Sequence, residues 1–140
     1  MSIYTTMLDL LPIIYPRFYI AHDASENELV LLNSGAPEIQ GVLITDKTQC
    51  EAFVNHYHLF ENIGKQNYEN VVAIGHAIAK NLHNALTQAF PTKTFIVYLE
   101  VSLKDSVMLR FHQIWENEQP YFDTSQPYEG VEIFTVGTRQ

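Results

Sequence analysis

Two alternating apolar segments within residues 94–113 constrain the fold of this chain more than any other feature. In residues 94–103 every second side chain is large and apolar, and in residues 107–113 the alternation resumes after a short polar turn. A period of two is typical of a strand with one buried face, so the pair predicts an antiparallel hairpin. The apolar rows are Phe95, Val97, Leu99, Val101 and Leu103 in the first strand and Val107, Leu109 and Phe111 in the second.

The register of this hairpin follows from the requirement that both apolar rows face the same side. A two-residue turn would place Arg110 and His112 on the apolar face, whereas a three-residue turn over 104–106 aligns the two rows. The second register predicts Glu100 opposite Arg110 and Tyr98 opposite His112 on the other face of the sheet.

Helical periods occupy the middle of the chain. Asp46 is a typical N-cap, with Gln49 three residues later, and a second helix ends before Pro91. Gly75, inside the longer helix, predicts close helix packing. The first of these helices carries Cys50, Phe53, Val54, Tyr57 and Phe60 at helical spacing, and the longer one carries Val71, Ile74, Ile78, Leu82, Ala85 and Leu86.

The remaining segments complete an α+β fold. We expect one domain over residues 1–140, with element order α-β-β-β-α-α-β-β-β and a mostly antiparallel sheet of about six strands on which a helical pair packs. The N-terminal helix places Ile3, Met7, Leu10 and Leu11 on one face. This helix is predicted at 3–11, and further strands are predicted at 17–22, 28–33, 40–45 and 131–136.

The charge of the chain is unevenly distributed. The formal net charge is −8, and residues 18–46 and 113–138 each carry five acids and no Lys or Arg. Such a field repels nucleic acid and acidic membranes and attracts a basic protein partner. The apolar runs are too short to span a membrane, the N-terminus lacks the features of a signal peptide, and the one cysteine, Cys50, is expected in the core. These features indicate a cytoplasmic protein and leave its oligomeric state open.

The sequence contains no recognisable catalytic or cofactor motif. There is no HExxH, CxxC, GxSxG or phosphate-binding glycine loop, so neither a metal nor another cofactor is expected. His56 and His58, placed on the predicted helix, would point in different directions, and His76 and His83 are seven residues apart. Histidines that are solvated or hydrogen-bonded explain this pattern better than a metal site.

The segment after the second hairpin strand combines aromatic rings with carboxylates. Rings supply anchor area on a binding surface and acids steer a basic partner, although the same rings would also suit a loop folded back over the sheet. The partner-binding candidates are Trp115 and Tyr121 as anchors and Glu116, Glu118, Asp123 and Glu129 as steering charges.

A small, acidic α+β domain with the stretch LRFHQIWENEQPYFD resembles the immunity proteins of bacterial contact-dependent growth inhibition and polymorphic toxin systems. The resemblance implies tight binding to a toxin domain, often a basic nuclease, whose active site is blocked. It covers about fifteen residues and the overall character of the chain, and it transfers no binding residue by position.

A second interpretation is a small enzyme or ligand-binding domain. It would use Glu100, Arg110 and His112 if their face of the sheet lines a pocket. Clustering of the three side chains in a deep concavity favours this alternative, whereas a flat, wet face favours the binding protein.

Overall fold

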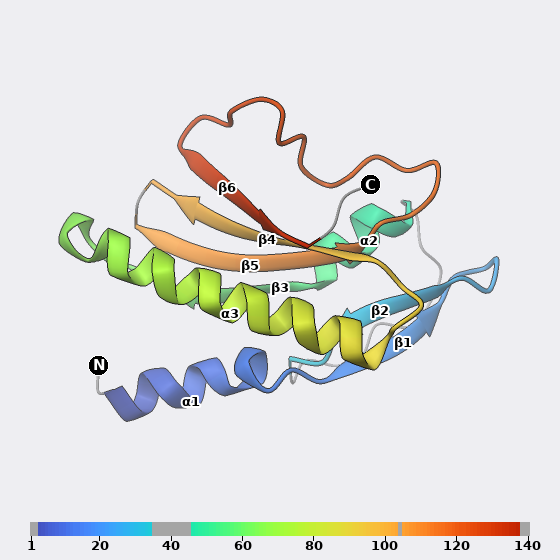
Figure 1. The fold of residues 1–140 in the computed structure, drawn as a ribbon, viewed down its shortest axis with the longest axis horizontal. Coiled ribbons are helices and arrows are strands. Elements are labelled where there is room, and N and C mark those ends of the chain that lie inside the picture. The colour runs from blue at the N-terminus through green and yellow to red at the C-terminus, as the bar shows by residue number, and fades with distance from the viewer. Residues whose placement is uncertain (1–2, 35–45, 104, 138–140) are drawn as a thin grey trace.

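The computed structural model describes residues 3–34, 46–103 and 105–137, with side chains from residue 7 onward. Its strands form an antiparallel two-stranded sheet, β1-β2, and an antiparallel four-stranded sheet in the order β3-β5-β4-β6 (Figure 1). The elements in chain order are α1 (Ile3–Ile14), β1 (Phe18–His22), β2 (Glu28–Leu32), α2 (Lys47–Val54), β3 (His56–Phe60), the short 3₁₀ turn η1 (Lys65–Asn67), α3 (Tyr68–Ala89), β4 (Phe95–Ser102), β5 (Ser106–Gln113) and β6 (Val131–Val136).

The predicted α+β class is confirmed, with the strands divided between two sheets. In Figure 1, α3 lies along one face of the four-stranded sheet, and the connection from β5 to β6 crosses the opposite side. The strand predicted at 40–45 lies outside the described residues. None of the described helices is both long enough and apolar enough to cross a membrane.

Helix α3 packs closely on the sheet because its buried face includes a glycine. A Cβ at Gly75 would lie 2.9 Å from Leu99 Cδ1, so a side chain there would displace the buried Leu99 side chain of β4. Close packing at this glycine was predicted and is confirmed. The predicted stripe is partly correct, because Ile74 is exposed and the buried positions are Val72, Gly75, Ile78, Ala79, Leu82 and Leu86.

The β4–β5 hairpin has the predicted faces but not the predicted partners. Its two apolar rows face the same core except for Leu103, which lies in the turn and is exposed. Tyr98 pairs with Arg110 and Glu100 with Met108, a shift of two residues from the predicted register. Ser102 pairs with Ser106, so the turn begins one residue earlier than expected. Leu103 permits this early turn by adopting a positive φ of 52°.

The second predicted helix is shorter than its spacing suggested. Asp46 caps α2 as predicted, since its Oδ1 accepts a hydrogen bond from the Gln49 amide at 2.7 Å. The helix ends at Val54, however, and residues 56–60 form β3, an edge strand paired with β5. The backbone of β5 offers a row of hydrogen-bonding N–H and C=O groups there, and a continued helix would leave these groups without a partner strand.

The N-terminal helix is longer than predicted and buries a different face. It continues through Pro12 to Ile14, and Leu10 and Ile13 enter the core. Met7 and Leu11, which the sequence placed on the same face as Leu10, are exposed.

Candidate functional site

The 114–130 segment, which connects β5 to β6, contains every predicted partner-binding residue. It has no helix or strand of its own, apart from an isolated bridge between Tyr128 and Val131. Loops of this length in compact domains are usually either functional or disordered. This one is held by contacts to the sheet and to α2, so its geometry can be described residue by residue.

The first contact buries the edge of Trp115 against a carboxylate. The indole Nε1–H donates a hydrogen bond to Glu51 Oε1 at 2.7 Å. Lys47, on α2, places its Nζ 5.0 Å from the centroid of the indole ring. Trp115 therefore folds back onto the molecule with its polar edge satisfied and its ring half-buried.

Glu51 is fully buried and accepts hydrogen bonds from four N–H donors. Besides Trp115, these are the backbone amide of Val30 at 2.8 Å and the backbone and side-chain amides of Gln113 at 2.9 and 2.8 Å. Burial raises the pKa of the Glu51 carboxyl, and the four donors oppose that rise by stabilising the carboxylate. One side chain thus joins β2, the end of β5 and the 114–130 segment.

Asn55, one turn after Glu51, extends this connection along β2. Its side chain accepts from the Leu32 amide and donates to the Val30 carbonyl, both at 2.8 Å. Glu51 on α2 and Asn55 at its C-cap therefore occupy backbone groups of β2 that another strand would use in a wider sheet.

Sequence reasoning missed both Glu51 and Asn55 as site residues. The only signal was that Glu51 immediately follows the core residue Cys50 on an amphipathic helix. Their roles depend on where β2 lies, and residues 30 and 51 are brought together only by tertiary structure.

Glu118 attaches the segment to the start of α2. Its Oε1 accepts from the backbone amide and the hydroxyl of Thr48, both at 2.8 Å, and its Oε2 lies 2.9 Å from Lys47 Nζ. Burial opposes ionisation, but the hydrogen bonds from Lys47 and Thr48 outweigh it and lower the pKa of Glu118. A carboxylate at the first turn of a helix is also stabilised by the helix dipole. The charge of Glu118 is therefore matched inside the molecule.

Tyr121 covers the polar face of the sheet. Arg110 lies against its ring, with Cζ 4.6 Å from the centroid, and the Tyr121 amide donates to His112 Nε2 at 3.1 Å. The neighbouring Phe122 contacts the rings of Tyr98, Tyr121 and Tyr128 edge-on. These contacts agree with the second interpretation of the rings, in which the loop folds back over the sheet.

Glu100, Arg110 and His112 share this covered face. Arg110 Nε donates to Glu100 Oε2 at 2.8 Å, and its Nη1 donates to the Ala52 carbonyl at 2.6 Å. His112 is 1 % exposed, and both ring nitrogens are engaged, Nδ1 with the Gln113 carbonyl and Nε2 with Tyr98 and Tyr121. The three side chains form a closed polar interior in which the imidazole has no nitrogen left for a substrate.

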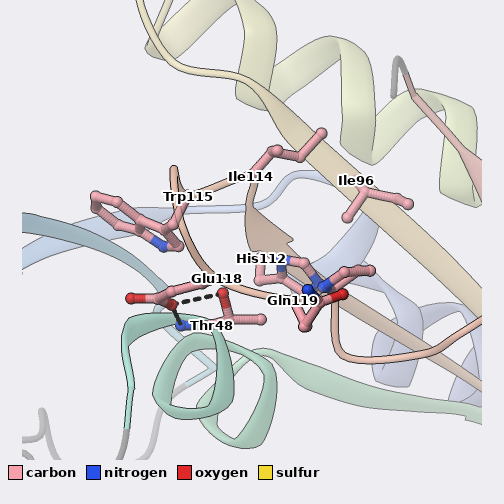
Figure 2. Close-up of a pocket in the computed structure, with 8 residues that line it drawn as sticks. Thr48, Ile96, His112, Ile114, Trp115, Glu118 and Gln119 are labelled. Carbon is pink, nitrogen blue, oxygen red and sulfur yellow. Dashed lines mark hydrogen bonds between the residues drawn. The ribbon is translucent and has the colours of Figure 1, made fainter. Parts of the chain in front are cut away.

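A small cavity lies beside this interior (Figure 2). Its volume is about 160 Å³, and polar and apolar side chains line it in similar measure. Figure 2 shows the indole of Trp115 on one side and the Thr48–Glu118 hydrogen bonds on another. The lining residues are Thr48, Ile96, His112, Ile114, Trp115, Glu118, Gln119 and Pro120.

The other predicted residues of the segment face solvent. Glu116, Asp123 and Glu129 are exposed. Asp123 Oδ1 also accepts from the amide and hydroxyl of Ser125, which shapes the local turn. The six predicted residues therefore separate into three half-buried residues that contact the sheet or α2 and three exposed carboxylates. Their role in partner binding stays a prediction.

The predicted divergence of His56 and His58 was wrong, because residues 56–60 form a strand instead of a helix. His56 and His58 then point to the same side, with ring centroids 5.6 Å apart, instead of diverging as on a helix. Within the described ranges, no group of three or more His, Cys, Asp or Glu side chains is arranged to hold a metal ion.

Comparison with known proteins adds no relative. No family model, no curated protein and no solved structure matches this chain.

Proposed function

We propose that this chain is a cytoplasmic binding protein that neutralises a basic protein partner, and specifically an immunity protein that blocks a bacterial toxin domain. The carrying observation is the 114–130 segment, an ordered acidic surface that spans one side of the sheet. It contains four carboxylates and no Lys or Arg, and β6 adds Glu132. Glu118 forms an ion pair with Lys47, whereas Glu116, Asp123 and Glu129 are exposed to solvent, where their charges contribute to long-range attraction.

The contacts of the segment favour tight binding because they hold it in place before a partner arrives. Trp115, Glu118 and Tyr121 fix it at three points, to Glu51, to α2 and to the face of the sheet. A loop that is already ordered loses less conformational entropy on association. In this proposal Trp115 and Tyr121 act mainly by positioning the acidic surface, and Glu116, Asp123 and Glu129 steer the partner.

Charge reversal tests the proposal. The tagged full chain is used to capture proteins from the lysate of its source cells at low salt, and the retained proteins are identified by mass spectrometry. We expect one stoichiometric basic protein that is released by raised salt, and restored growth when the chain is co-expressed with it. Replacing both Glu116 and Glu129 by Lys should slow association and weaken its salt dependence.

The matched control reverses two exposed acids elsewhere, Glu26 and Glu61. That variant carries the same net charge as the segment variant and should bind the partner almost normally. If no partner is captured at low salt, the proposed function is contradicted. If both charge-reversed variants lose the same amount of affinity for the partner, the placement of the binding surface on the 114–130 segment is contradicted.

A further inference from the structure

Helix α1 carries apolar side chains on its outer face as well as on its inner face. Leu10 and Ile13 are buried in the core, whereas Met7, Leu8, Leu11 and Tyr15 are 57 %, 66 %, 41 % and 74 % exposed. The last four form the α1 stripe, because Met7, Leu11 and Tyr15 follow one another at four-residue intervals and Leu8 lies beside Leu11. A helix that is apolar on both faces requires a second surface against which to pack.

The size of the stripe matches half of a small protein interface. With these exposures the four side chains present roughly 500 Å² to solvent, near the upper end of the largest apolar patch on an ordinary monomer. Two such stripes, if fully covered by each other, would bury about 1,000 Å² in total, which is the lower limit for a biological interface.

The net charge of the chain restricts self-association to a nearly neutral face such as this one. Two molecules of net charge −8 repel each other, and the repulsion is smallest where they meet through a nearly neutral face. Between residues 7 and 17 the only charged side chains are Asp9 and Arg17, which have opposite signs. The stripe is thus both apolar and uncharged on an otherwise acidic protein.

We propose that this chain forms a homodimer in which the α1 stripes of two copies pack antiparallel about a two-fold axis. Leu11, in the middle of the stripe, then lies near the axis against its own counterpart, and Tyr15 of each copy reaches the Met7 end of the other. Figure 1 shows α1 and the 114–130 segment on opposite sides of the four-stranded sheet. The dimer therefore leaves both acidic segments facing outward, and its formation does not depend on the proposed function.

The first test is the oligomeric state of the full chain, measured by sedimentation equilibrium from micromolar to millimolar concentration. We expect a monomer–dimer equilibrium, and Leu8→Glu should raise the dissociation constant by roughly 100-fold because a charge is buried in each copy. The matched control is Leu103→Glu, at a side chain 80 % exposed outside the stripe, which should dimerise like the native chain. Circular dichroism confirms that both variants are folded.

The second test examines the geometry through disulfide cross-linking. Leu11→Cys should form a covalent dimer under mild oxidation, whereas Leu103→Cys should not, and the native Cys50 is buried and does not compete. A native chain that is monomeric throughout the range, including one that instead binds phosphatidylcholine vesicles, overturns the proposal. If Leu8→Glu dimerises with the same dissociation constant as the native chain, the assignment of the dimer interface to α1 is overturned. If the chain dimerises but Leu11→Cys does not cross-link, the two-fold arrangement is overturned.

Discussion

Replacing Glu51 by Gln isolates the role of the buried carboxylate, because the two side chains have nearly the same shape. Each carboxylate oxygen accepts two hydrogen bonds. Oε2 accepts from the Val30 amide and the Gln113 side chain, and Oε1 accepts from the Gln113 backbone amide and the Trp115 indole. An amide must direct its NH₂ group at one of these pairs, so two hydrogen bonds are lost and two buried donors are left without an acceptor.

The expected cost follows from these two broken contacts. Hydrogen bonds to a charged group contribute about 1.5–3 kcal/mol each, and removing the buried charge returns part of that through the desolvation it no longer suffers. We therefore expect Glu51→Gln to lower the free energy of unfolding by roughly 3 kcal/mol, and the melting temperature by about 10 °C.

Urea unfolding followed by circular dichroism measures this difference at neutral pH. The control is Glu116→Gln, which removes an exposed carboxylate and should change the free energy of unfolding by less than about 0.5 kcal/mol. A Glu51→Gln variant as stable as the control would refute the reasoning, because the four donors would then not depend on a charged acceptor.

Three further predictions concern contacts elsewhere in the fold. Glu118→Gln should destabilise the chain by about 1–2 kcal/mol at neutral pH. Because the folded pKa of Glu118 is lowered, this contribution is present above its ordinary value of 4.5 and is lost as the pH falls through the lowered pKa, so urea midpoints of variant and native chain should converge in acid. The hydrogen bond to Glu132 raises the pKa of Tyr68 to about 12, so the stabilising effect of this bond is present below pH 10 and lost as the pH rises through about 12. An absorbance titration of Tyr68→Phe should therefore lose one tyrosine step near pH 12. Gly75→Ala should lower the melting temperature, since crowding against β4 costs more than the gain in helix propensity of about 1 kcal/mol, and a higher melting temperature would contradict the close approach.

Local periodicity accounts for most of what the sequence predicted correctly. The β4–β5 faces follow from alternation alone, and β6 has the predicted bounds of 131–136. The β4–β5 partners were wrong because a shift of two residues preserves the faces, and only the turn conformation at Leu103 distinguishes the registers.

Tertiary contacts decided the features that the sequence could not predict. The spacing of Tyr57 and Phe60 is compatible with a helix, but the open edge of β5 selects a strand. Within the candidate site, the rings and acids were predicted as a group, whereas their division into internal and exposed members was not. That division depends on Glu51 and on the start of α2, which are more than sixty residues away in sequence.

The placement of Trp115 gives the protein a built-in optical reporter. It is the single tryptophan of the chain, so intrinsic fluorescence excited at the indole band arises from one known place. Its N–H contacts a carboxylate and a lysine ammonium lies over its ring, so the emission depends on the local field at the junction between α2 and the 114–130 segment. A partner that lifts the segment should shift the emission to longer wavelength, whereas one that binds the exposed acids without moving it should leave the spectrum unchanged. The mode of docking can thus be read without a label.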